Sequence, residues 1–228
     1  MRFRIGGGIF TLRLWPTFLT LVIFAILAGL GTWQVERLHW KENLIATIEM
    51  RMKEAPVDAA RFADSAHVDY RNAYASGIFQ NGKEIYTTAI SPKGEGGYHV
   101  LTPLRLKKNR YLLVNRGWVP YGKKLPDTRK PGQLSNTVTI KGILRVAPQG
   151  WMQPSDKQKI VRLVSLPEFL PFVLEADAAP NPGGYPVGGQ TRLNLPNNHL
   201  GYAITWYALA LALLIIYGFS AFQKSSAD

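Results

Sequence analysis

His199 is the residue whose type and position in this sequence point most directly to chemistry. It lies in residues 193–223, a segment without a single Asp, Glu, Lys or Arg. Tyr202 and Trp206 follow three and seven residues later, so a helix would place them on the same face as His199. An ionisable side chain at the end of an apolar helix indicates a functional site. The spacing therefore predicts one helical face that carries an imidazole, a phenol and an indole.

That face has two interpretations. In the first, His, Tyr and Trp form an interfacial belt that hydrogen-bonds lipid headgroups and anchors the helix. In the second, the neutral imidazole of His199 is a ligand, for example an axial ligand of haem iron whose ring is covered by aromatic and aliphatic neighbours. Residue types and spacing alone leave both interpretations open.

Two segments have the length and composition of transmembrane helices. A hydrocarbon core about 30 Å thick needs about 20 apolar residues, and residues 200–222 supply them. A second charge-free run covers residues 14–35. It is longer than the apolar part of a signal peptide and continues as a helical pattern into Glu36 and Arg37, so we expect an uncleaved span. The helical pattern goes on beyond the apolar run and is expected to end before Pro56.

Small residues in the first span indicate that another helix packs closely against it. Ala25 and Gly29 form a small-xxx-small pair, with Ala28 and Gly31 beside them. The partner helix is either the second span of this chain, which also contains several alanines, or a helix of another protein.

The charges at the two ends of the chain predict its orientation. Arg2, Arg4 and Arg13 precede the first span, and Lys224 and Asp228 follow the second. By the positive-inside rule both termini are expected in the cytoplasm, and the long middle segment on the other side. The predicted organisation is a tail at 1–13, spans at 14–35 and 200–222, a domain at 36–199, and a second tail at 223–228.

The middle segment shows the pattern of a β-rich domain. Short runs rich in β-branched and aromatic residues are separated by turn signals such as Asn81-Gly82. We expect strands at 70–79, 84–90, 97–106, 110–120, 137–146 and 160–166, and a further strand after a short helical turn from Leu166. The predicted fold class is a membrane α+β protein, in which two transmembrane helices flank an antiparallel sheet or small barrel.

Composition limits the kinds of function. The chain has a net charge of +12 and no cysteine, which excludes disulfides, thiolate catalysis and Cys-bound metals. Nucleic acid is not an expected partner for a domain on the far side of a membrane, whereas anionic lipid headgroups or an acidic protein suit its charge. The histidines lack metal-ligand spacing, and no G-x-S-x-G, S-x-x-K or H-E-x-x-H motif occurs. We therefore expect a protein that is not an enzyme and has no metal site of its own.

The chain resembles the Surfeit-locus assembly factors of cytochrome c oxidase. The matching segments occur in the family's order and cover nearly the whole chain: LGTWQVERLHWKENLI, YRNAYASGIF, GYHVLTPLR, LLVNRGWVP, PNPGGYPVGG and NNHLGYAITWYALA. The resemblance implies two transmembrane helices around a domain on the outer face of a bacterial inner membrane or its mitochondrial equivalent. The short N-terminal segment favours the bacterial, periplasmic arrangement.

The resemblance also implies a function. Members of the family take part in maturation of oxidase subunit I, and bacterial members bind haem a. The histidine of the NNHL motif, here His199, would then be the haem ligand through which iron binds, with Tyr202 and Trp206 as candidates for the pocket. The expected partners are subunit I, haem a synthase and membrane lipids. The alternative is a scaffold that stabilises an early oxidase intermediate without binding haem.

Overall fold

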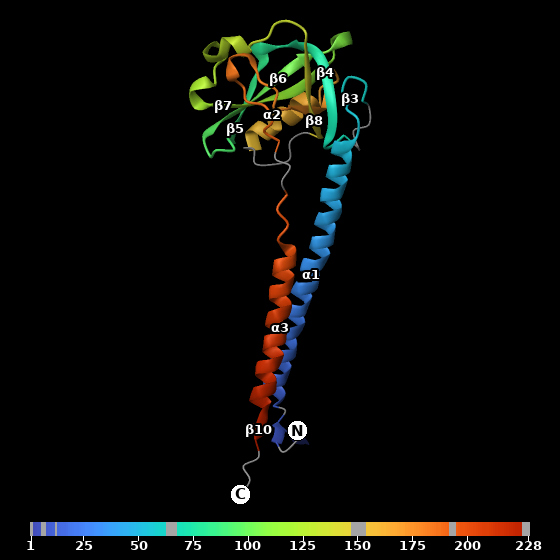
Figure 1. Ribbon diagram of the computed structural model, residues 1–228, viewed down its shortest axis with the longest axis vertical. Helices are drawn as coiled ribbons and strands as arrows, with labels where there is room; N and C mark the ends of the chain where they lie inside the picture. Colours follow the sequence, from blue (N-terminus) through green and yellow to red (C-terminus); the bar gives the residue numbers. More distant parts are fainter. Residues whose placement is uncertain are drawn as a thin grey trace. The chain divides into compact units, whose positions relative to one another are not determined.

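The computed structural model describes residues 2–5, 8–11, 13–62, 68–146, 154–191 and 195–224 (Figure 1). The chain divides into two compact units. One unit contains Met1–Thr47 and Asn194–Asp228, and the other is the intervening Ile48–Leu193. The first unit carries the two long helices, and the second carries a sheet domain.

The elements follow one another along the chain in a simple order. The helices are α1 (Leu14–Lys53), α2 (Pro154–Val164) and α3 (His199–Ala221). The strands are β1 (Arg2–Ile5), β2 (Gly8–Thr11), β3 (Val57–Asp58), β4 (Arg71–Phe79), β5 (Ile85–Ile90), β6 (Gly96–Arg105), β7 (Tyr111–Pro120), β8 (Val138–Val146), β9 (Phe169–Ala176) and β10 (Phe222–Lys224). Short 3-10 turns are η1 (Asn81–Lys83), η2 (Lys107–Asn109), η3 (Tyr121–Lys123), η4 (Pro126–Gly132) and η5 (Pro182–Gly184).

Both α1 and α3 are long and apolar enough to cross a membrane. α1 is one continuous helix of 40 residues, which confirms the expected extension past the apolar run and the end before Pro56. Large apolar side chains on both helices are exposed, as Leu19 and Ile216 illustrate. Apolar surface that is not covered by protein suits a lipid environment. The chain therefore has the character of a membrane protein with two spans.

A small sheet joins the two ends of the chain. β2 pairs with β1 on one side and with β10 on the other, and both pairings are antiparallel. The sequence prediction gave only tails at these two ends, although Phe3, Ile5, Ile9 and Phe10 are residue types that favour strands. Because β10 follows directly after α3 and β2 precedes α1, the sheet ties the two helices together at this end of the first unit.

The sheet of the second unit closes on itself. Its strand order is β3-β4-β8-β9-β7-β6-β5, and β4 also pairs with β6 at Ile78–Arg105 and Phe79–Leu104. The result is a five-stranded ring of β4, β8, β9, β7 and β6. Outside this ring, β3 pairs with β4 and β5 pairs with β6. Closure removes unpaired strand edges, which are aggregation sites. Of the two expected architectures, the structure adopts the small barrel.

Alternating side chains of the strands fill two hydrophobic clusters. In β9, Phe172 and Leu174 point into the main cluster, which contains residues of β4, β6, β7 and β8, while Val173 points to the opposite face. There it meets Ile160 and Val164 of α2. This alternation is the period of two expected for strands covered on both faces. α2 is therefore the cover of the outer face of β9.

The structure confirms a β-rich domain between two candidate membrane helices and changes two details. The sheet is mixed, because β7 pairs with β9 and β3 with β4 in parallel. The prediction of a strand at 160–166 is wrong, because residues 160–164 belong to α2. Ile160, Leu163 and Val164 have the i, i+3, i+4 spacing of a helix face, and all three pack into one cluster. β-branched composition had suggested a strand, but the burial pattern is helical.

Candidate functional site

His199 is the first residue of α3 and is hydrogen-bonded to α1. Its Nδ1 lies 2.7 Å from Oε1 of Gln34. Because a carbonyl oxygen only accepts, Nδ1 is the nitrogen that carries the proton in this arrangement. Among the residues that the structure describes, the ring has no other hydrogen-bond partner. The Nε2 lone pair of a half-buried imidazole is therefore left unengaged.

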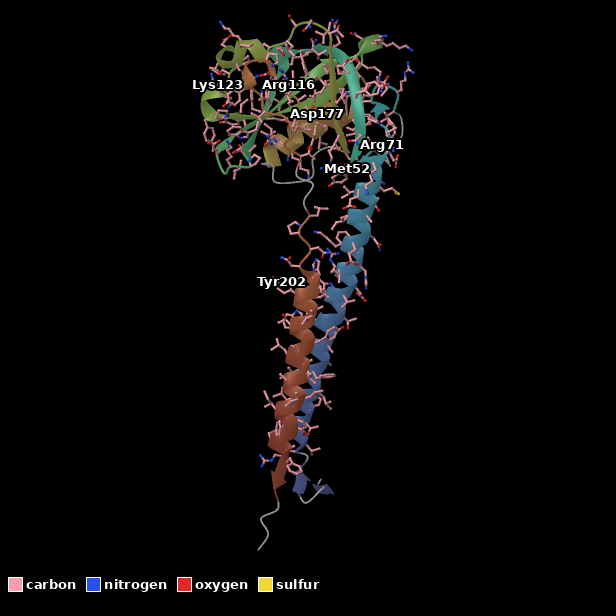
Figure 2. All side chains as sticks on the ribbon, viewed as in Figure 1. Met52, Arg71, Arg116, Lys123, Asp177 and Tyr202 are labelled. Atoms are coloured by element: carbon pink, nitrogen blue, oxygen red, sulfur yellow. The ribbon has the colours of Figure 1, made fainter. Side chains whose placement is uncertain are left out.

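Tyr202 and Trp206 lie on the next two turns of α3 but do not bond to His199 in the described part of the chain. Tyr202 is 57% exposed, and Figure 2 labels it near the beginning of α3. Trp206 is half-buried. The arrangement leaves an aromatic surface on the same helix end as the imidazole. Their part in a pocket stays a prediction.

A close contact fixes how α3 packs against α1. Gly31 is buried under the ring of Tyr207, and a Cβ at Gly31 would lie 2.7 Å from a ring carbon. The Tyr207 hydroxyl also lies 3.0 Å from Oγ1 of Thr32. In contrast, Ala25 and Gly29 are exposed. The second span of this chain therefore packs against Gly31 rather than against the Ala25–Gly29 pair.

A further link lies near the other end of the helix pair. The hydroxyl groups of Thr17 and Tyr217 are hydrogen-bonded. Gln34 and Thr17 are separated by about 26 Å along α1 at about 1.5 Å rise per residue. This is close to the hydrocarbon thickness of about 30 Å. The Gln34–His199 pair is thus expected at one boundary of the membrane and the Thr17–Tyr217 pair at the other.

The other two histidines that the structure describes, His39 and His99, lie outside α3. His39 lies on the exposed surface of α1, with Nδ1 3.5 Å from Glu42. His99 stands opposite Trp118 across the β6–β7 pairing, and His67 lies outside the described residues. Within the described ranges, no three His, Asp or Glu side chains are placed to hold a metal ion. His199 is the histidine with a defined partner inside a helix pair.

The domain contains a buried charged cluster that sequence reasoning missed. The pairing register of β6 with β7 shifts between Val100 and Leu101, so that Arg116 is the extra residue of a β-bulge. The bulge turns the Arg116 side chain inward. Its Nη2 donates to the Gly132 carbonyl at 2.5 Å, and its guanidinium lies over the Phe79 ring. Burial lowers the pKa of Arg116 to about 10, and the nearby negative charge of Glu84 partly offsets this lowering. Nη2 of Arg116 also donates to Oδ1 of Asn181 at 3.4 Å. The arginine of the NRGW motif thus joins the PNPGG loop to the loop of Gly132, which gives both motifs a structural role.

A cavity of about 560 Å³ opens on the β4, β8 and β9 side of the domain. Its lining is Pro56, Asn72, Ala73, Tyr74, Lys141, Gly142, Ile143, Glu175, Ala176, Asp177, Gly189 and Thr191. It contains no His, Met or Cys, and the Glu175 carboxylate already accepts a hydrogen bond from Thr191. Apart from Tyr74, its side chains are not of the types that commonly bind haem iron. His199, with one ring nitrogen held by Gln34, therefore remains the stronger candidate.

Gln34 is the site residue that sequence reasoning did not single out. It is the only Asn or Gln in the charge-free run 14–35, close to the end that leads toward the domain. An amide near the end of an apolar span is a signal that could have been paired with the imidazole at the start of the other span. Composition alone does not say which face of the helix it occupies.

Along the chain, a closed β domain lies between two helices that are long and apolar enough to cross a membrane, and His199 of the second helix is hydrogen-bonded to Gln34 of the first. These features are those of a membrane protein with two candidate spans. Residues 21–211 match the family described as the SURF1 family, and the chain belongs to it. Membership implies a role in the assembly of cytochrome c oxidase.

Several relatives match over most of their length. The chain is 32% identical to a SURF1-like protein of Monosiga brevicollis, with 94% of this chain and 88% of the relative covered. It is 33% identical to Surfeit locus protein 1 of Mus musculus, with 90% and 74% covered. For Surfeit locus protein 1 of Homo sapiens the identity is 32%, with 81% and 70% covered.

Proposed function

We propose that this protein is an assembly factor that binds haem a transiently through His199, receives it from haem a synthase and helps to deliver it to nascent subunit I of cytochrome c oxidase. The observation that supports the proposal most directly is the state of the His199 ring. One nitrogen is engaged by Gln34, and the other keeps a lone pair at the start of an apolar helix.

The residues around His199 fit a haem cargo. Neutral imidazole is a common haem ligand, and apolar surface suits the ring and its lipid tail. Tyr202, three residues after His199 on the same helix face, provides such surface, since it is 57% exposed. A single histidine also suits a carrier, because a cargo held through one protein ligand is more easily released than one held through two.

The same proposal includes a location. The arginines before α1 support cytoplasmic termini and a periplasmic domain in a bacterial inner membrane. Gln34 lies near the middle of α1, where the charge-free run 14–35 ends on the side that leads to the domain in sequence. The Gln34–His199 pair would then lie at the periplasmic boundary. Oxidase components and anionic lipids are partners suited to a domain with an excess of basic residues.

The second candidate function is a haem-independent scaffold for an early oxidase intermediate. It is favoured by the exposed position of Gly29, where an added Cβ would meet no atom within 4 Å. A partner helix could pack there without displacing α3. On this account, bulky substitutions at Ala25 or Gly29 abolish oxidase assembly, whereas loss of the imidazole does not.

A complementation experiment separates the two functions. Cells that lack this protein receive wild type, His199→Ala, His39→Ala or Gly29→Leu, and assembled oxidase is measured in membranes by its haem a absorbance. The haem proposal predicts loss of oxidase with His199→Ala only. Full assembly with His199→Ala together with loss in Gly29→Leu would favour the scaffold.

A further inference from the structure

Gln34 is placed to control how His199 presents its ring. It comes from a different helix, and its Oε1 is 2.7 Å from Nδ1 of His199. Gln34 and His199 are both half-buried, so water competes less for this hydrogen bond than on an open surface.

The hydrogen bond determines which ring nitrogen is available. In a neutral imidazole one nitrogen donates and the other accepts, and the partner of the first decides which is which. An amide oxygen facing Nδ1 selects the Nδ1–H form. The lone pair then belongs to Nε2, which lies on the side of the ring away from Gln34.

Neighbouring contacts hold Gln34 in this position. Three residues before it, Gly31 is packed under the Tyr207 ring, and Thr32 is hydrogen-bonded to the Tyr207 hydroxyl. These contacts set the rotation and the height of α1 against α3 independently of the imidazole. The contacts of Tyr207 thus fix the packing of α1 against α3, and this packing places the Gln34 amide beside His199.

We infer that Gln34 is a positioning residue: it fixes the tautomer and ring direction of His199 so that Nε2 is the nitrogen presented to haem iron. The inference deepens the proposed function and depends on it for the identity of the ligand bound. It extends to this chain a general feature of ligating histidines, whose second nitrogen is held by an oxygen acceptor, with losses of about 10- to 100-fold in affinity when that acceptor is removed.

The first test uses the haem-free protein in lipid nanodiscs at pH 8. Nitrogen-15 NMR of labelled histidine reports the tautomer, and His199→Ala identifies the His199 signals. The expected result is Nδ1–H in wild type, a shift toward Nε2–H in Gln34→Leu, and Nδ1–H retained in Gln34→Glu. Thr17→Val, which removes the remote link to Tyr217, serves as the control and should leave the tautomer unchanged.

Two outcomes of this test overturn the inference. An Nε2–H form in wild type would mean that the Gln34 amide faces His199 through its nitrogen. An unchanged tautomer in Gln34→Leu would mean that Gln34 does not select it. The conservative Gln34→Glu variant keeps the test informative if the leucine variant folds poorly, since retention of Nδ1–H supports the inference and its loss contradicts it.

The second test uses protein loaded with haem a. Gln34→Leu is expected to bind haem about 10- to 100-fold more weakly, and Gln34→Glu to lower the reduction potential of the bound haem, because a nearby carboxylate makes the imidazole more electron-rich. Unchanged affinity and potential in both variants would contradict a positioning role. If the tautomer result holds but His199→Ala keeps its haem, the proposed function fails while the structural relationship stands.

Discussion

Arg129 and Glu84 form a buried ion pair in the β domain, with both side chains 2% exposed. Nη1 of Arg129 donates to Oε1 of Glu84 at 3.1 Å, and Nη2 donates to Oε2. Nε of Arg129 donates to the Lys123 carbonyl, so the guanidinium also holds the start of the η3–η4 turn. Arg116 lies 4.0 Å from the same carboxylate. One acidic side chain thus offsets two buried cations.

Replacing Glu84 by Gln should destabilise the domain strongly. The change keeps the shape of the side chain but leaves two buried guanidinium groups without their counter-ion. A loss of about 3 to 5 kcal/mol in the free energy of unfolding is expected. Denaturant unfolding followed by tryptophan fluorescence measures it, and Glu95→Gln on an exposed turn should change it by about 0.5 kcal/mol or less. Equal effects of the two variants would contradict the account.

Tyr86 should contribute to stability in a pH-dependent way. Its hydroxyl donates to Glu84 at 2.6 Å. Burial, then the hydrogen bond and charge of Glu84, raise its pKa well above the ordinary value of about 10, partly opposed by Arg129. A raised folded-state pKa stabilises the fold fully below pH 10, and this contribution is lost as pH rises further.

The corresponding measurement is the difference in free energy of unfolding between wild type and Tyr86→Phe from pH 7 to pH 11.5. The difference should be constant up to about pH 9 and shrink from about pH 10, where the unfolded chain begins to ionise. Titration of Arg116 is shared by both proteins and largely cancels. A difference that grows above pH 10 would show that Tyr86 is not held in its neutral form.

Gly117 should tolerate no side chain. Its φ is +121°, and a Cβ there would lie 2.0 Å from the Val187 carbonyl oxygen. Trp118, the next residue, forms an isolated antiparallel β-bridge with Val187. Backbone strain and displacement of this bridge should cost Gly117→Ala roughly 3 kcal/mol or more in the free energy of unfolding. Gly122→Ala, which has no atom within 4 Å of its Cβ, is the matched control. Thermal unfolding of the two variants compares them directly, and a control-like result for Gly117→Ala would refute the close approach.

The helix pair should be more sensitive at Gly31 than at Gly29. A leucine at Gly31 collides with the Tyr207 ring and should separate Gln34 from His199, whereas Gly29 has free space around it. Gly31→Leu is therefore expected to reduce haem binding by at least about 10-fold, as removal of a ligand's supporting contact does, and Gly29→Leu to leave it unchanged. Titration of each variant with haem a measures the affinity; the reverse order of the two effects contradicts the proposed packing.

Sequence patterns predicted the elements of this fold better than their connections. Apolar length and charge were enough for α1 and α3, and alternation was enough for most strands, because these signals are local. The closure of β4 on β6 at Ile78–Arg105 depends on partners far apart in the chain, so it has no local pattern. The same is true of the bulge that buries Arg116.

Only part of the candidate site was predicted, because its two residues lie far apart in the chain. His199 stood out because an imidazole at the start of an apolar helix is unusual. Gln34 lies 165 residues away, and its relation to His199 depends on the rotation of two helices about their axes. The contact of Gly31 with Tyr207 fixes this rotation. In the sequence, Ala25 and Gly29 were equally plausible small residues for the helix contact.

The most direct test of the central claim is an absorption spectrum of the purified protein from cells that make haem a. Wild type, His199→Ala and His39→Ala are compared for haem content per chain and for the spectrum of the reduced form. The account predicts bound haem a in wild type and His39→Ala, and loss of it in His199→Ala. Full haem content and an unchanged spectrum in His199→Ala would contradict the assignment of His199 as the ligand.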